Sequence, residues 1–147
     1  MSRVAGAALL SLLAVLIASA SDSPDFSGVW VETQPDSSRP LRLQLTQSGS
    51  QVQVRISRGD SFPEKIFATA TLQNGTAVWT LPQSCIARFR WAGYNYDHPG
   101  TSTFTLSLQA GESGLQLVYV EETRWNAPCA NNHPVGTERV QKILKRR

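Results

Sequence analysis

The chain has 147 residues, with 14 lysines and arginines against 11 aspartates and glutamates, and a formal net charge of +3. This length is that of one domain, and so mild a positive charge, without aromatic residues interleaved among the basic ones, excludes a dedicated nucleic-acid-binding surface. Only two histidines and two cysteines are present, so metal and thiol chemistry have few candidate residues.

The first 20 residues have the pattern of an export signal. Arg3 is followed by an apolar run over 5–18, and Ala18-Ser19-Ala20 is a small-residue cleavage site. An uncleaved N-terminal anchor is the alternative. We therefore predict a signal peptide over 1–20, a single domain over 21–147 and a secreted or periplasmic protein. No other apolar stretch predicts contact with the interior of a membrane.

Short segments with alternating apolar and polar residues then follow one another to the end of the chain, which is typical of β-strands with one dry face. Turn residues separate them, among them Asn74-Gly75, a favoured hairpin turn, and Pro82, which is expected to end a strand. Longer loops are predicted over 93–100 and 126–136. The predicted strands are 28–33, 41–46, 51–57, 65–72, 76–81, 85–91, 103–108, 115–120 and 137–144.

The last of these segments is ambiguous, because Val140, Ile143 and Leu144 fit a helical stripe as well as a strand. We favour a strand, since an exposed antiparallel meander has two raw edges and closing it into a barrel removes both. The sequence thus predicts an all-β fold, an antiparallel up-and-down barrel of eight or nine strands.

Basic residues crowd the C-terminal segment with Glu138 as their only acidic neighbour: Arg139, Lys142, Lys145, Arg146 and Arg147. Such a cluster can touch an anionic partner. The interpretation we favour is a solvated edge strand kept soluble by its charge.

Cys85 and Cys129 are the two cysteines. In an oxidising compartment a disulfide between them is expected, and it would stabilise the fold by about 3–4 kcal/mol by closing a loop of about 44 residues. Two buried free thiols are the alternative.

The first predicted strand opens with Gly28-Val29-Trp30. This opening, after an export signal, resembles the Gly-x-Trp start of the calycin barrels, the lipocalins and their relatives. The resemblance implies a lipocalin-like barrel in which Trp30 plugs one end and a basic residue from a late strand packs on it. Arg139 is the expected residue, with Lys142 as the second candidate. Some small secreted peptidase inhibitors share this barrel.

Catalytic and metal-binding patterns are weak. His98 and His133 each precede a proline in a predicted loop, with no spacing typical of a zinc site or a catalytic triad. Glu121 and Glu122 are consecutive in a strand and face opposite sides. We therefore predict a non-enzymatic protein with no metal and no cofactor. Asn74 lies in a glycosylation acceptor sequence that the hairpin turn already explains.

The strongest functional signal is a set of aromatic residues with one arginine. If the disulfide forms, it draws Trp91, Tyr94 and Tyr96 toward Arg124 and Trp125 at one end of the barrel. Such a set predicts a mouth that binds a small hydrophobic molecule, although these rings would also serve to cap the core. The alternative function is binding of an exported protein. An example is inhibition of a secreted peptidase through the N-terminal segment 21–26, which we call the lead.

Overall fold

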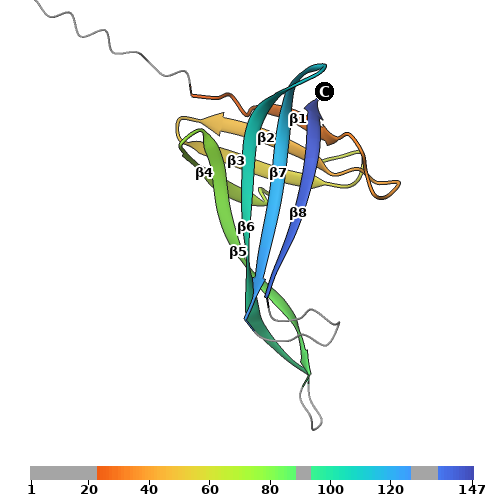
Figure 1. Cartoon of the computed structure of the whole chain (residues 1–147), viewed down its shortest axis with the longest axis vertical. Coiled ribbons are helices and arrows are strands. Elements are labelled where there is room, and N and C mark those ends of the chain that lie inside the picture. Colours follow the sequence, from red (N-terminus) through yellow and green to blue (C-terminus); the bar gives the residue numbers. More distant parts are fainter. Residues whose placement is uncertain (1–22, 89–93, 127–135) are drawn as a thin grey trace, which may run out of the picture.

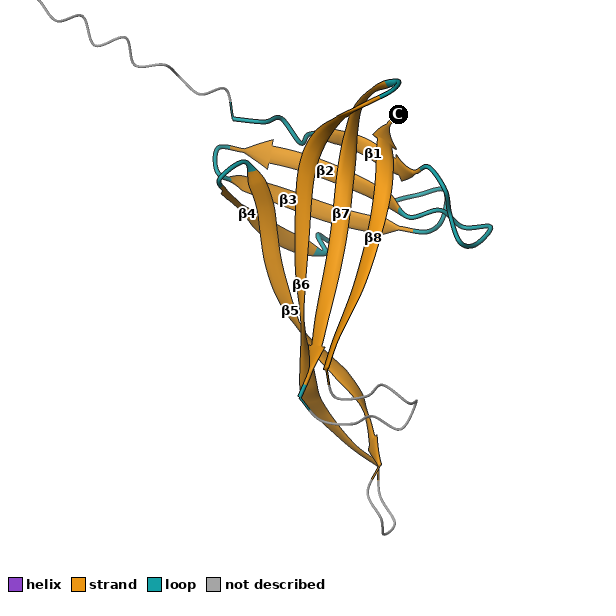
Figure 2. Ribbon diagram, viewed as in Figure 1, coloured by secondary structure: helices purple, strands orange, loops and turns teal. Residues whose placement is uncertain are grey.

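The computed structural model describes residues 23–88, 94–126 and 136–147, and of 84–88 and 94–99 it describes the backbone (Figure 1). Eight antiparallel strands in these ranges form a closed barrel in chain order. They are β1 Gly28–Glu32, β2 Arg42–Ser48, β3 Gln51–Ser57, β4 Ala68–Gln73, β5 Thr76–Arg88, β6 Tyr94–Gly111, β7 Gly114–Trp125 and β8 Gly136–Arg146. Within these ranges the chain contains only strands and loops (Figure 2), so the predicted all-β up-and-down barrel is confirmed.

Pro82 does not end a strand, and that prediction was wrong. β5 continues through Pro82, which pairs with Thr101 of β6. On its other side β5 is paired to β4 over 76–78. Proline lacks an N–H group and is tolerated where a strand has a free edge. Two predicted strands are therefore one, and the barrel has eight.

The predicted loop over 93–100 is also wrong for the residues that the structure describes, because β6 begins at Tyr94. The turn signal there came from Pro99 and its neighbours. Pro99 lies between the pairs Gln83–Gly100 and Cys85–Asp97, where the register shifts. A β-bulge accommodates a residue that cannot donate to the ladder, so the strand runs on.

The last segment is a strand, not a helix. β8 pairs with β7 from Trp125–Gly136 to Gln116–Lys145, and its end pairs with β1. The pairs of this β1–β8 seam are Trp30–Arg146, Val31–Lys145 and Glu32–Leu144. The final strand thus closes the barrel onto the first one, as the barrel interpretation required.

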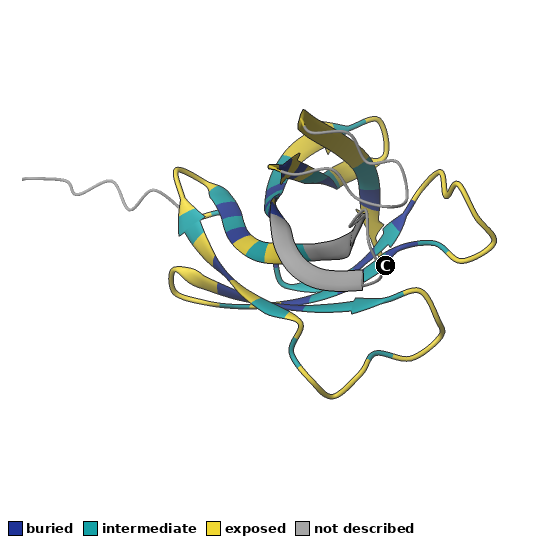
Figure 3. Ribbon diagram, turned by 90° about the horizontal axis from the view of Figure 1, so that it is seen from below, coloured by how far each residue is buried: buried dark blue, intermediate teal, exposed yellow. Residues whose placement is uncertain are grey.

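The barrel has two unequal halves. The short strands β1–β4 cross the upper part of the long strands β5–β8, and the lower part of β5–β8 extends beyond them (Figure 1). Buried and exposed residues alternate along the strands, as expected where one face of each strand is inward (Figure 3). We call the part of β5–β8 that extends beyond the short strands the half-barrel extension. Its inner face is continuous with the inner face of the barrel core.

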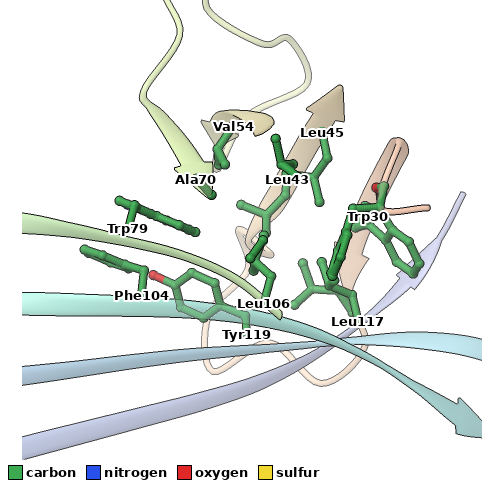
Figure 4. Packing of buried hydrophobic residues seen from close by; sticks show 14 of the residues in the cluster. Trp30, Leu43, Leu45, Val54, Ala70, Trp79, Phe104, Leu106, Leu117 and Tyr119 are labelled. Atoms are coloured by element: carbon green, nitrogen blue, oxygen red, sulfur yellow. Dashed lines mark hydrogen bonds between the residues drawn. The ribbon is translucent and has the colours of Figure 1, made fainter. Parts of the chain in front are cut away.

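The core fills the space where the two halves overlap. All eight strands contribute side chains to this core, which lies between Trp30 at one end and a stacked pair, Trp79 and Phe104, at the other (Figure 4). The fully or almost fully buried aliphatic residues between them are Leu43, Leu45, Val52, Val54, Leu106, Leu117 and Leu144. The protein's own side chains thus occupy the centre of the barrel.

The predicted signal peptide lies outside the described residues. No helix in the described ranges has the length and apolar character needed to span a bilayer.

Candidate functional site

One end of the barrel is plugged by Trp30, as the calycin resemblance implied. Its side chain is 0% exposed, and its Nε1 donates a hydrogen bond to the Phe26 carbonyl at 2.8 Å. The guanidinium of Arg146 lies over the indole, 4.7 Å from the ring centroid, and donates to the Asp25 carbonyl at 2.8 Å. Phe26 is itself fully buried. The lead before β1 and the end of β8 together seal this end.

The cation on the plug is thus Arg146, and the prediction of Arg139 was wrong. Register decides it, because Trp30 pairs with Arg146 across the seam. Arg139 lies seven positions earlier on β8, roughly 23 Å away along a strand, and faces outward beside Glu122 at 3.7 Å with 60% of its side chain exposed. The second candidate, Lys142, has a different partner.

Lys142 forms a buried ion pair with Glu32 at the base of the seam. Their side chains are 11% and 3% exposed, and Lys142 Nζ contacts Glu32 Oε1. The other carboxylate oxygen accepts a hydrogen bond from the Leu41 N–H at 2.8 Å, and Asp36 lies 3.3 Å from the ammonium. The hydrogen bond to Glu32 raises the pKa of Lys142 above its ordinary value. This pair fastens β1 to β8 where their pairing ends.

The other end of the core is aromatic. Trp79 of β5 and Phe104 of β6, directly paired in the sheet, stack with ring centroids 4.8 Å apart and an angle of 4°. Tyr119 of β7 lies 6.2 Å from Phe104 on the same inner face (Figure 4). Phe67, on the segment before β4, meets the Phe104 ring edge-on and is 46% exposed. We call Trp79, Phe104 and Tyr119 the aromatic platform.

Trp79 carries an unusual polar atom. Its Nε1 is buried and has no hydrogen-bond partner among the described residues. Buried donors are nearly always paired, and leaving one unpaired costs about 1–3 kcal/mol. A ligand with a hydrogen-bond acceptor, or a water molecule, would therefore be stabilised by accepting a hydrogen bond from Trp79 Nε1.

Beyond the platform the inner face becomes polar. The hydroxyls of Ser102 and Thr123, paired across β6 and β7, lie 2.5 Å apart, and both residues are buried. The Tyr119 hydroxyl donates to Glu121 Oε2 at 3.1 Å. Burial first, and then the Glu121 charge, raise the pKa of Tyr119 well above its ordinary value. The extension thus offers an apolar platform bordered by fixed polar groups.

The predicted ligand-binding set is only partly described. Trp125 is buried, packs on Gly100, and donates from Nε1 to Glu138 Oε2 at 3.3 Å. Arg124 is exposed. Because consecutive strand residues face opposite sides, Arg124 and Trp125 do not line one pocket.

The remaining predicted site residues lie where side chains are not described. Tyr94 and Tyr96 belong to β6 with backbone alone, and Trp91 lies outside the described residues. The same holds for the predicted disulfide: Cys85 is on β5 with backbone alone, and Cys129 lies outside. Both predictions stay open.

The described residues contain no group of three or more side chains able to hold a metal ion. Comparison with protein-family models, with curated proteins and with solved structures finds no match to this chain.

Sequence reasoning missed most of the platform. Trp79 lies in the predicted strand 76–81, and Phe104 and Tyr119 are apolar positions of the separate predicted strands 103–108 and 115–120. The alternation along each strand already assigned them to inner faces. What the sequence did not contain was the register that brings the three rings together.

Proposed function

We propose that this protein is a non-enzymatic, calycin-like binding barrel that takes a small, largely apolar ligand on the aromatic platform. The observation that carries the proposal is the buried Nε1 of Trp79, for which the described part of the chain supplies no hydrogen-bond partner. A ligand with a carbonyl or similar acceptor would satisfy that donor while its apolar part covers the rings. The predicted secreted or periplasmic location suits such a carrier.

The position differs from the centre of the barrel, and packing is the reason. The aliphatic core side chains named above, between Trp30 and Trp79, are 0–2% exposed, whereas Trp79, Phe104 and Tyr119, although buried, keep 4–6% exposure. A ligand there would have to displace well-packed aliphatic groups, which costs free energy. The platform instead borders the half-barrel extension, whose polar residues Ser102, Thr123 and Glu121 can orient a bound molecule.

Retinal and a fluorescent fatty acid are suitable probes, titrated into the purified protein while tryptophan emission is followed. We expect saturable quenching by both. Trp79→Phe keeps a ring and removes the donor, so it should weaken retinal binding about tenfold, equivalent to about 1.4 kcal/mol for one hydrogen bond. If neither retinal nor the fatty acid binds the folded protein saturably, the proposal is refuted.

Ligand chemistry supplies a control in the same protein. A retinoid analogue that lacks the oxygen should bind the wild type and Trp79→Phe with equal affinity, since it uses only the rings. A tenfold loss for this analogue as well would show that Trp79 acts through packing alone and would remove the assigned hydrogen bond.

Binding of an exported protein, such as a peptidase, remains the second candidate. The structure gives the lead a structural role, because Phe26 is buried and its N–H donates to Gln47 Oε1 at 2.9 Å. Deleting 21–26 would therefore damage the barrel end. Deleting 21–24 leaves the anchor in place, and loss of inhibition of a secreted peptidase by that variant would favour this candidate.

A further inference from the structure

A groove of about 560 Å³ lies outside the barrel, where β8, β1 and β2 are neighbours. Its axis is one row of the outer sheet face: Val31 of β1 pairs with Arg42 of β2 on one side and with Lys145 of β8 on the other. Arg147, whose N–H donates to the Val29 carbonyl, also lines it. Pro40 adds an apolar surface at the end near the loop. The groove thus joins an apolar floor to four cations, and one of them, Arg146, is already placed over Trp30.

Two of these cations are uncompensated. Lys145 and Arg147 are exposed, and no carboxylate partner is found for either among the described residues. Glu32, which also lines the groove, is already bound by Lys142. The other side-chain carboxylate of the lining is that of Asp60. The groove therefore carries a net positive charge.

The third cation is held in position before any ligand arrives. Arg42 Nη1 donates to the Gly59 carbonyl at 2.6 Å, and its guanidinium lies 5.1 Å from the centroid of the Phe62 ring. A guanidinium fixed in this way loses little side-chain entropy when it binds an anion. Its remaining donors are available for bidentate contact.

The C-terminal basic cluster now divides into groups. Arg139 pairs with Glu122, Lys142 pairs with Glu32, and Arg146 covers Trp30. For Lys145 and Arg147 the described residues supply no such contact, and both line the groove. The interpretation of a strand kept soluble by its charge accounts for cations distributed along β8. It does not explain why Lys145 and Arg147 line the same groove as Arg42.

We propose that this groove binds a small organic phosphate monoester, with the phosphate among Arg42, Lys145 and Arg147 and the organic part on Val31 and Pro40. A phosphate monoester carries nearly two negative charges at neutral pH and three acceptor oxygens, which matches three converging cations better than a carboxylate does. The volume lies in the range of small-ligand sites. The groove is separate from the aromatic platform, so the two sites can be tested independently.

Phenyl phosphate is the probe, titrated by calorimetry and by amide chemical shifts at low salt and at 0.5 M salt. We expect saturable binding that weakens with salt and is at least tenfold tighter than binding of benzoate. Lys145→Gln/Arg147→Gln should weaken phenyl phosphate at least tenfold. The matched control, Lys65→Gln/Arg139→Gln, removes two exposed cations outside the groove and should change affinity less than twofold.

Unfolding curves that match the wild type will show that both double variants are folded. Equal losses in the two variants would show that only net charge matters and would overturn the proposal. Absence of saturable phenyl phosphate binding, or equal affinity for benzoate, would also overturn it. Vesicles containing phosphatidic acid form a separate arm: binding to them without binding of phenyl phosphate would replace the small-ligand site with a membrane surface.

Discussion

Replacing Lys142 with methionine should destabilise the barrel strongly at neutral pH. The change leaves the carboxylate of Glu32, whose side chain is 3% exposed, without its cation. Breaking a buried pair in this way costs about 3–5 kcal/mol. We expect the lower end, about 3 kcal/mol, because the Leu41 N–H still donates to this carboxylate and Asp36 is 92% exposed. Urea unfolding followed by tryptophan emission measures the free energy.

Two further variants isolate the cause. Glu32→Gln/Lys142→Met removes both charges and keeps an acceptor for the Leu41 N–H, so it should lose less than Lys142→Met alone. Arg139→Met breaks an exposed pair on the same strand and should cost about 0–1 kcal/mol. If Lys142→Met and Arg139→Met lose the same free energy, the seam pair does not act as we infer.

The pH dependence follows from the raised pKa of Lys142. A lysine whose pKa is higher in the folded state stabilises fully below the unfolded pKa, near 10.5, and loses that contribution as pH rises through its folded pKa. Wild-type stability should therefore fall above pH 10.5 more steeply than that of Lys142→Met. Parallel alkaline curves would contradict this assignment.

Three other variants test separate contacts. Arg146→Met removes the cation over Trp30 and should cost about 1–2 kcal/mol with a shifted tryptophan emission, whereas unchanged emission would contradict the stacking. Gly100→Ala places a Cβ 2.7 Å from an indole carbon of Trp125 and should destabilise the protein by about 1–3 kcal/mol. As the control, Gly59→Ala places its Cβ 3.8 Å from the nearest atom and should cost less than about 0.5 kcal/mol. Equal stabilities of the two variants would refute the close approach of Gly100 and Trp125. Tyr119→Phe and the wild type should show the same phenolate absorbance at every pH up to alkaline unfolding, because burial keeps Tyr119 protonated in the folded protein. If the variant lacks a titration step near pH 10 that the wild type has, Tyr119 is not buried as described.

Local patterns predicted the elements whose turns are local. Alternation over the predicted strands 41–46 and 51–57, with Gly49 in the short gap between them, indicates the β2–β3 hairpin, and Asn74-Gly75 predicted the β4–β5 turn, where both residues have positive φ. In each case the residues that specify the structure lie within a few positions of one another, so one segment contains the whole signal.

The errors concern interactions between distant segments. Whether Pro82 ends a strand depends on whether another strand pairs beside it, which the local sequence does not record. The plug cation depends on the register between the first and last strands. Part of that answer was nevertheless available, because Arg139 and the inward Leu144 are an odd number of positions apart and so face opposite sides.

The candidate site was predicted less well than the fold for the same reason. Five residues were grouped through an expected disulfide, and two of them, Arg124 and Trp125, are on opposite faces of β7. The platform and the groove each gather side chains from three different strands. These side chains become neighbours only through the pairing of the strands, so no single sequence motif predicts either site.

The unequal pairing of the strands has a consequence for how the molecule assembles. β5 to β8 are joined by long ladders between consecutive segments, whereas β1 and β8 meet through three pairs that bring together opposite ends of the polypeptide. Contacts between sequence neighbours lose little loop entropy, and end-to-end contacts lose much more. The long meander is therefore expected to form early, and the closing of the ring to be the last step of folding and the first to reverse. Among amides paired in the strands, native-state exchange should accordingly be faster at Val31 than in the middle of β6.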